Sequence, residues 1–164
     1  MFDSWRGGVV VKVARELKVT PITNGTVIDH IPPGMALKVL SILGITGNED
    51  YTVSVAMNVS SKKFGKKDIV KVESRELSPK EVNKIALIAP HATINIIREY
   101  DVVKKYRVRL PKKVVGIVRC ANPSCITNSG EPVESEFIVI STKPLRLKCV
   151  YCEREILDVK DYIV

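Results

Sequence analysis

The sequence contains few of the residues from which catalytic and nucleic-acid-binding sites are most often built. It has two histidines, three phenylalanines, one tryptophan and five tyrosines. No Ser-His-Asp set, paired acidic residues or open metal site can be assembled around the two histidines, which disfavours an independent enzyme. The aromatic residues are not interleaved with basic ones, which argues against a surface on which nucleic-acid bases stack.

Long apolar segments and the glycine motifs of nucleotide-binding proteins are also missing. The longest uncharged stretch, residues 85–97, contains Pro90, His91 and Asn95 and is well short of a membrane span. No apolar signal-peptide segment follows Met1, so we expect a soluble, cytoplasmic protein in a reducing compartment, without a membrane partner. Because neither a P-loop nor a Gly-x-Gly-x-x-Gly element occurs, any nucleotide would be held by side chains on a sheet.

Basic residues outnumber acidic ones, 26 Lys and Arg against 18 Asp and Glu, for a formal net charge of +8. This excess favours polyanionic partners such as nucleotides, nucleic acids or an acidic protein surface. Each of two basic clusters could face phosphates or form a solvated face. The clusters are Lys62, Lys63, Lys66, Lys67 and Lys71 around Gly65, and Lys104, Lys105, Arg107, Arg109, Lys112 and Lys113.

The four cysteines form two short pairs, Cys120 with Cys125 and Cys149 with Cys152. Two disulfides would suit a secreted chain, and a redox Cys-x-x-Cys would be expected early in a βαβ unit without a second pair. The spacing instead predicts a zinc site with four thiolate ligands. Because four thiolates leave no position open for water, we expect one structural zinc ion per chain.

The chain is predicted to form two domains, residues 1–110 and 111–164, joined near Pro111. The second is too small to be held together by apolar burial alone. Zinc binding can supply roughly 10 to 16 kcal/mol in comparable sites, so this domain should unfold when the metal is removed. It is predicted to be all-β, with strands at 114–118, 137–140 and 145–148 and no helix.

The N-terminal domain is predicted to be α+β, a mostly antiparallel sheet with two helices on one side. Residues 51–59 alternate as a half-buried strand, with Tyr51, Val53, Val55, Met57 and Val59 on one face. The first helix is expected at 34–43. The second begins at the capping box of Ser78 and Glu81 and stops before Pro90. Further strands are expected from residue 93 and at 102–110, separated by a turn at Tyr100-Asp101.

Two polar features in this domain are candidates for ligand binding. A β-type run ends in Asp29-His30, where the carboxylate could accept bonds from ribose and the imidazole could lie near a phosphate. Ordinary turn chemistry at a strand end is the alternative. Thr93, Asn95 and Ile97 share one face of their strand, which is polar for a core and could hold a ligand or a partner subunit.

Taken together, these features resemble the aspartate carbamoyltransferase regulatory chain family over nearly the whole sequence. The residues that carry the resemblance are GTVIDHIP (25–32), GKKDIVK (65–71), AP (89–90), ATIN (92–95), EPV (131–133) and the two cysteine pairs. The resemblance implies a noncatalytic subunit in pyrimidine biosynthesis, whose effector-binding (allosteric) domain, 1–110, binds inhibitory CTP and activating ATP, with UTP as a further candidate. It also implies a homodimer through that domain and docking of the zinc domain, 111–164, onto the catalytic chain.

The family's effector site can be carried over residue by residue. Asp29 and His30 would lie beside the ribose and triphosphate, Lys105 near ribose or phosphate oxygens, and Lys71 near base or ribose. Pro21 departs from the small residue expected there and has no N–H to donate to a base. The remaining implied residues of the site are Val19, Ile22, Val27, Asn95, Ile97, Tyr100 and Val102.

Two points stay open at this stage. Residues 1–15 extend beyond the family's usual N-terminus and have no assigned role. A zinc-ribbon protein that binds nucleic acid is the alternative function, since it too would be basic and carry four cysteines. Salt-dependent binding to RNA or DNA, without binding of CTP, would favour that alternative.

Overall fold

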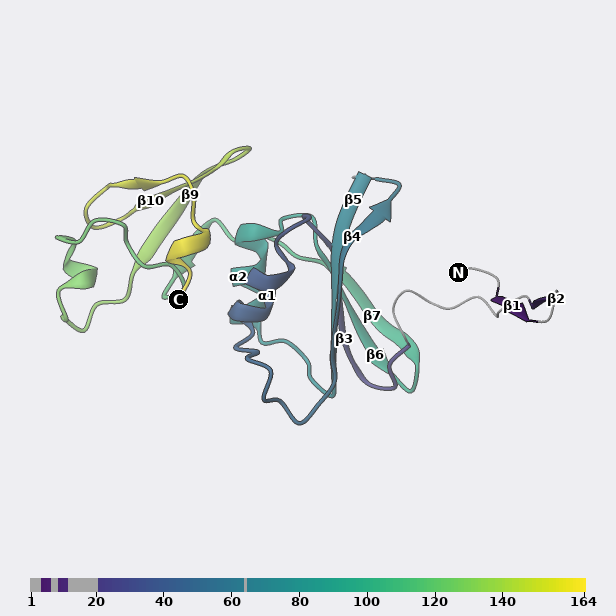
Figure 1. The fold of residues 1–164 in the computed structure, drawn as a ribbon. Coiled ribbons are helices and arrows are strands. Elements are labelled where there is room, and N and C mark those ends of the chain that lie inside the picture. Colours follow the sequence, from purple (N-terminus) through teal and green to yellow (C-terminus); the bar gives the residue numbers. More distant parts are fainter. Residues whose placement is uncertain (1–3, 7–8, 12–20, 64) are drawn as a thin grey trace.

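The computed structural model describes residues 4–6, 9–11, 21–63 and 65–164. Two short strands, β1 (Ser4–Arg6) and β2 (Val9–Val11), pair antiparallel with each other and with no other described strand. From residue 21 onward the chain forms a five-stranded sheet with two helices, followed by a four-stranded sheet (Figure 1). Residues 1–15 therefore lie mostly outside the described part of the chain.

The larger sheet has the strand order β4-β5-β3-β6-β7, and every neighbouring pair is antiparallel. Both helices, α1 (Ala36–Ile42) and α2 (Pro79–Ile88), lie on the same side of it (Figure 1). This arrangement confirms the predicted α+β class. The strands are β3 (Gly25–Ile31), β4 (Val53–Ser61), β5 (Gly65–Glu73), β6 (Thr93–Arg98) and β7 (Asp101–Arg107).

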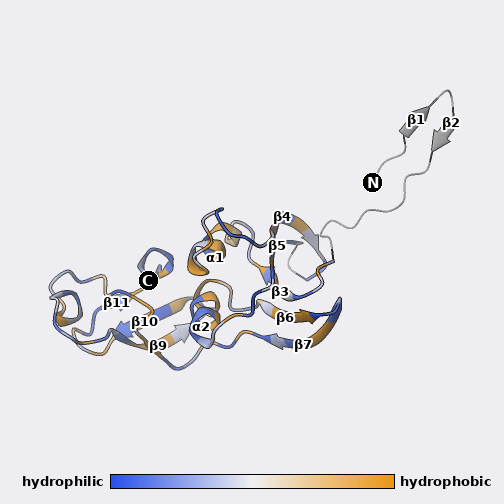
Figure 2. Ribbon diagram, turned by 90° about the horizontal axis from the view of Figure 1, so that it is seen from below, coloured by the Kyte–Doolittle hydropathy of each residue, from blue (hydrophilic) through white to orange (hydrophobic). Residues whose placement is uncertain are grey.

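The core of this part lies between the helices and the sheet. Figure 2 shows hydrophobic and hydrophilic residues interleaved along both helices, as expected for helices buried on one face. The predicted capping box at the start of α2 is confirmed, because Ser78 and Glu81 each bond the other's backbone N–H. The fully buried side chains of the core include Ile28, Ile31, Val39, Val70, Val72, Ile85 and Ile94.

A buried carboxylate, Asp68, connects α1 to the sheet. Its Oδ2 accepts hydrogen bonds from the backbone N–H groups of Gly34 (2.9 Å) and Ala36 (3.1 Å), and its Oδ1 accepts one from Asn58 (2.9 Å). The N-cap residue of α1, Met35, makes no side-chain cap. Asp68, from β5, therefore serves the start of α1 as a cap that is distant in sequence.

Strand β4 departs from its predicted alternation. The pairing register with β5 shifts between Ala56 and Val59, and Asn58 has a φ of 59°. Val55 pairs with the buried Val70 before the shift, so it lies on the helix-facing side but is 39% exposed, whereas Met57 lies within the shift and is 42% exposed. The shift is a β-bulge after Ala56, which interrupts the two-residue period at Met57 and Asn58. β4 is also an edge strand of its sheet.

The smaller sheet contains β8 (Lys113–Val115), β9 (Glu136–Thr142), β10 (Leu145–Cys149) and β11 (Glu155–Ile156), in the order β11-β10-β9-β8. Three strands match predicted ones, but β8 stops early because Gly116 has a φ of 70°. Two single turns of 3₁₀ helix, η1 (Ile126–Asn128) and η2 (Lys160–Tyr162), and the two-residue β11 were not predicted. Elements this short have no recognisable periodicity.

Helix α2 contributes to both hydrophobic cores. Ile85 and Ala86 pack in the first core, whereas Leu87 belongs to the second, together with Phe137 and Leu147. The C-terminal sheet is therefore packed against α2 through Leu87. In the part of the chain that the structure describes, no helix is long and apolar enough to cross a membrane.

Candidate metal centre and effector-binding face

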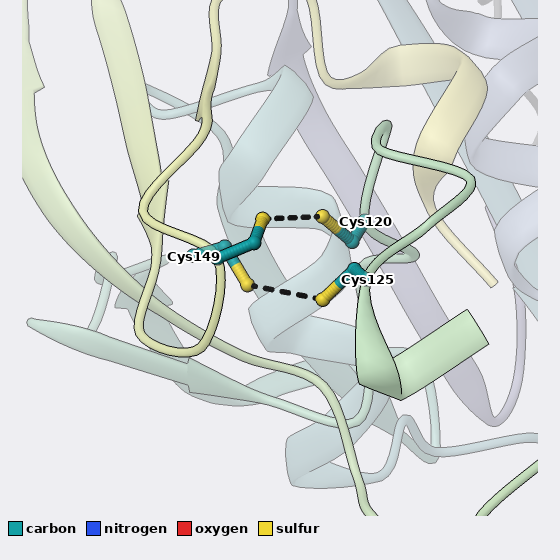
Figure 3. A group of neighbouring side chains, drawn as sticks. Cys120, Cys125 and Cys149 are labelled. Carbon is teal, nitrogen blue, oxygen red and sulfur yellow. Dashed lines mark hydrogen bonds between the residues drawn. The ribbon is translucent and has the colours of Figure 1, made fainter. Parts of the chain in front are cut away.

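The structure brings the four cysteines into one cluster. All four sulfur atoms lie within 4.8 Å of one another, with Cys120 and Cys152 separated by 3.5 Å and Cys125 and Cys149 by 3.8 Å (Figure 3). Tetrahedral zinc–thiolate bonds of roughly 2.3 Å place sulfur atoms about 3.8 Å apart. The cluster therefore fits one structural zinc ion.

Polar contacts to the backbone and to one sulfur atom fix the first cysteine turn. Asn128 donates from Nδ2 to the carbonyl oxygens of Cys120 (2.9 Å) and Asn122 (2.7 Å), and the N–H of Cys125 donates to Asn122 (3.1 Å). The Thr127 hydroxyl donates to Cys125 Sγ (3.2 Å). Such surrounding bonds orient metal ligands before the ion arrives.

The thiols differ in how readily they ionise. Burial raises the pKa of Cys120 to about 12 and also raises the pKa of Cys149. At Cys152, desolvation opposes ionisation, but hydrogen bonds from the Arg154 backbone and from neighbouring side chains lower the pKa to about 7. Zinc binds thiolates, so loading this cluster must release protons and the metal affinity should rise with pH.

A second candidate site lies on the face of the larger sheet opposite the helices. Lys71, Val27, Asn95 and Lys105 are paired in register across β5, β3, β6 and β7. Residues paired in this way project to the same side of a sheet. Their neighbours in sequence, such as Ile28, Val70 and Ile94, are buried against the helices, so this row faces away from them.

Lys71 is the most enclosed charged residue of this face, with only 5% of its surface exposed. Desolvation lowers the pKa of its ammonium group, and the charge of Glu73 partly opposes that effect. Among the residues that the structure describes, no carboxylate lies within ion-pair distance of Lys71. A buried lysine of this kind suits a ligand that brings oxygen acceptors.

Asp29 and His30 lie at a bulge inside β3, because the strand continues to Ile31 and His30 has a φ of 60°. Lys67 Nζ lies 2.9 Å from Asp29 Oδ1, and His30 Nδ1 lies 3.2 Å from Thr93 Oγ1. Sequence reasoning placed Lys67 in a basic cluster but not in the site. The two-residue periodicity of a strand could have predicted that Lys67 belongs to the site, because Lys67 and Lys71 fall on the same face of β5.

The remaining predicted residues lie toward one end of this face. Ile97 pairs with Gly25 and with Val102, and the N–H of Tyr100 donates to the Thr23 carbonyl (3.0 Å), which sets the β6–β7 turn beside residues 21–24. Gly25 is required because a Cβ would clash with the Val72 carbonyl. Ile22 and Ile97 are buried, whereas Pro21, Tyr100 and Val102 are exposed; Val19 lies outside the described residues.

Comparison with known proteins gives concordant matches along the chain. The family description "Aspartate carbamoyltransferase regulatory chain, allosteric domain" matches residues 17–109, and "Aspartate carbamoyltransferase regulatory chain, metal binding domain" matches residues 112–160. A relative from Methanothrix thermoacetophila is 60% identical over 93% of this chain and 99% of its own length. A relative from Korarchaeum cryptofilum is 62% identical over 84% of this chain and 88% of its own length. A relative from Saccharolobus solfataricus is 58% identical over 87% of this chain and 90% of its own length.

All three relatives are named aspartate carbamoyltransferase regulatory chain. Similarity of this extent covers the larger sheet with its helices as well as the cysteine cluster. The chain belongs to the aspartate carbamoyltransferase regulatory chain family, as the resemblance predicted.

Proposed function

We propose that this chain is the noncatalytic subunit through which nucleotides control aspartate carbamoyltransferase in pyrimidine biosynthesis. CTP inhibits and ATP activates by binding to one shared site on the outer sheet face, and UTP is a further candidate effector. The observation that carries the proposal is the row of Lys71, Asn95 and Lys105 on that open face. An effector domain, residues 1–110, holds this row, and a docking domain, 111–164, holds the zinc.

The proposed nucleotide lies across the strands. Lys105 and His30 contact triphosphate oxygens, while Asp29 and Lys71 contact the ribose or base edge. The buried Ile22 and Ile97 and the exposed Tyr100 and Val102 flank the base. Purine and pyrimidine effectors share the triphosphate, so the lysines provide affinity and the base end determines the direction of the response.

The proposed contact with the catalytic chain is the surface around the cysteine turns. Ile126 follows Cys125 directly and Tyr151 lies between Cys149 and Cys152; their side chains are 48% and 45% exposed. Exposed apolar residues on a rigid turn suit a protein partner. With Cys120, Cys125, Cys149 and Cys152 as its ligands, zinc holds the shape of this surface and takes part in no chemistry.

The effector domain is proposed to form a homodimer through edge strand β4. Its outer backbone edge, which pairs with no other described strand, and the exposed Val55 and Met57 offer a place for a second copy to add. A monomeric mass for the purified chain in light scattering at micromolar concentration would contradict this part of the proposal.

Co-purification with the catalytic chain tests the proposed function as a whole. Aspartate saturation curves of the complex should shift to higher aspartate with CTP and to lower aspartate with ATP. Couplings of about 1 to 3 kcal/mol would give shifts of roughly five- to hundredfold. Turnover of carbamoyl phosphate and aspartate by this chain alone would contradict the noncatalytic assignment.

Replacing Lys105 by alanine should weaken binding of both CTP and ATP at least about tenfold, because a charge-assisted hydrogen bond contributes roughly 1.5 to 3 kcal/mol. Titration calorimetry of the zinc-loaded chain measures both affinities. Lys104→Ala is the matched control, since Lys104 lies on the opposite face of β7 over the Tyr106 ring. Unchanged affinities in Lys105→Ala would rule out this assignment of the triphosphate contact.

A further inference from the structure

A groove of about 540 Å³ lies between α2 and the edge strand β7, on the helix-bearing side of the larger sheet. Figure 2 shows α2 on the β6–β7 side of that sheet and α1 on the β4–β5 side. Ile96 of β6 pairs with Lys104 of β7, and the buried Ile94 pairs with Tyr106. Lys104 and Tyr106 therefore project toward α2 and into the groove, whereas Lys105 faces the opposite side of the sheet.

The outer edge of β7 pairs with no other strand in the part of the chain that the structure describes. Every residue of β7 is exposed except Tyr106, which is half-buried. Along such an edge, alternate residues direct their backbone N–H and C=O groups away from the sheet. An extended segment that pairs with β7 would satisfy these groups and direct every second side chain into the groove beside α2.

The groove combines an apolar floor with a basic rim. Leu77, Val82 and Ile96 line it and pack against the core while remaining partly exposed. The basic side chains of its lining are Lys104, Arg107 and Arg109, against a single carboxylate, Glu76.

Two of these cations are available to a ligand. Glu76 is already paired with Arg98 at 2.6 Å, and Arg107 is hydrogen-bonded to His91. Lys104 and Arg109 are exposed, and neither has a carboxylate within ion-pair distance among the described residues. The groove therefore favours an occupant that carries negative charge.

The same charges disfavour a second copy of this chain at this edge. Pairing two β7 strands would bring Lys104, Lys105 and Arg107 of each copy against basic residues of the other. Like charges across a strand pair are destabilising, and lysine on an edge strand commonly prevents such self-association. The β7 edge thus differs from the β4 edge, which exposes Val55 and Met57.

We propose that the β7 edge and the groove beside α2 form a docking site for an extended, acidic segment of a partner protein, which joins the larger sheet as an additional strand. Apolar side chains of the segment pack on Leu77, Val82 and Ile96, and flanking carboxylates pair with Lys104 and Arg109. The nucleotide face lies on the other side of β7, so the docking site does not depend on the proposed nucleotide function.

Fluorescence anisotropy of the full, zinc-loaded chain with a labelled peptide, Glu-Glu-Ile-Glu-Val-Glu-Glu, tests the site. In an extended conformation this peptide presents Ile and Val on one face with a Glu at each end of that face. Lys104→Glu and Arg109→Glu should each weaken binding at least about tenfold, because each reverses a charge that pairs with a carboxylate. Salt at about 0.15 M limits the effect of more distant charges.

Two controls separate strand addition from attraction by general charge. Lys80→Glu, which reverses an exposed charge on α2 outside the groove, should change the affinity less than about twofold. A peptide with N-methyl groups on its Ile and on the next Glu keeps every charge but loses two N–H donors, and it should bind at least about tenfold more weakly. Hydrogen exchange should show new protection of β7 amides when the unmodified peptide binds.

The proposal is overturned if the peptide shows no saturable binding up to about 1 mM, or if Lys80→Glu loses as much affinity as Lys104→Glu. Equal binding of the N-methylated peptide, or protection that appears on β4 or the cysteine turns, would also contradict it. Displacement of the peptide by a short oligouridylate would show a general polyanion surface in place of a peptide site. Unchanged CTP affinity in Lys105→Ala would leave the peptide result intact, so the two proposals can fail separately.

Discussion

Removing zinc, by chelation or by Cys149→Ser, is expected to unfold the four-stranded sheet while the five-stranded sheet remains folded. Cys149 is fully buried in the same core as Phe137 and Leu147, so losing the metal leaves unpaired thiols in a small apolar core. Metal binding supplies roughly 10 to 16 kcal/mol in sites of this kind, as much as the whole stability of an ordinary domain, roughly 5 to 15 kcal/mol. No compensating interaction in a sheet of this size approaches that loss.

Hydrogen exchange with the zinc content measured in parallel would follow this unfolding strand by strand. Amides of β9 and β10 should lose protection in step with zinc release, while those of β3 and β6 keep it. Ser124→Ala, an exposed position in the first cysteine turn, is the control and should retain zinc. Docking to the catalytic chain should be lost and CTP binding retained. Loss of CTP binding on mild chelation would instead show that the proposed boundary at residue 110 divides a single unit.

Asp68→Ala is expected to lower the free energy of unfolding of the five-stranded sheet by at least about 3 kcal/mol. The substitution leaves the backbone N–H groups of Gly34, Ala36 and Asn58 without their acceptor; Ala36 is buried, whereas Gly34 and Asn58 are exposed residues whose bonds to Asp68 are partly buried. It also removes the only side-chain cap described for α1. Each unsatisfied buried group costs roughly 1 to 3 kcal/mol, and residual access to water keeps the sum near the lower end.

Urea unfolding followed by far-ultraviolet circular dichroism would measure this loss. Asp68→Asn keeps one carbonyl acceptor and should lose less stability than alanine, whereas Asp50→Ala, at an exposed position, should change it by under about 0.5 kcal/mol. The zinc content should be unaffected, because Asp68 has no contact with the cysteine cluster. A loss below about 1 kcal/mol in Asp68→Ala would mean that water replaces the carboxylate.

The features that sequence reasoning predicted correctly are those whose partners are close in the chain. The capping box joins Ser78 to Glu81, and each cysteine pair spans a single turn. The polar face of β6 was visible as alternation, but its alignment with Lys71 and Lys105 depends on register across four strands.

The features that were missed depend on distant partners. Asp68 lies in a run that reads as an ordinary strand, and its partners are Gly34 and Asn58. The pairing of Lys67 with Asp29 spans 38 residues. The bulge at Asn58 has no local signal, because the residues around it alternate regularly and only the pairing with β5 reveals the shift.

The membership of α2 in two hydrophobic cores has a consequence for how the two sheets are oriented. Ile85 and Leu87 are two positions apart, so they project about 200° from each other around the helix axis, into different cores. Inserting or deleting one residue before them would turn both by about 100° and misalign the two cores together. The rotational position of this helix about its own axis therefore determines which of its side chains enter each core, and so how the five-stranded sheet packs against the sheet that carries the cysteine cluster.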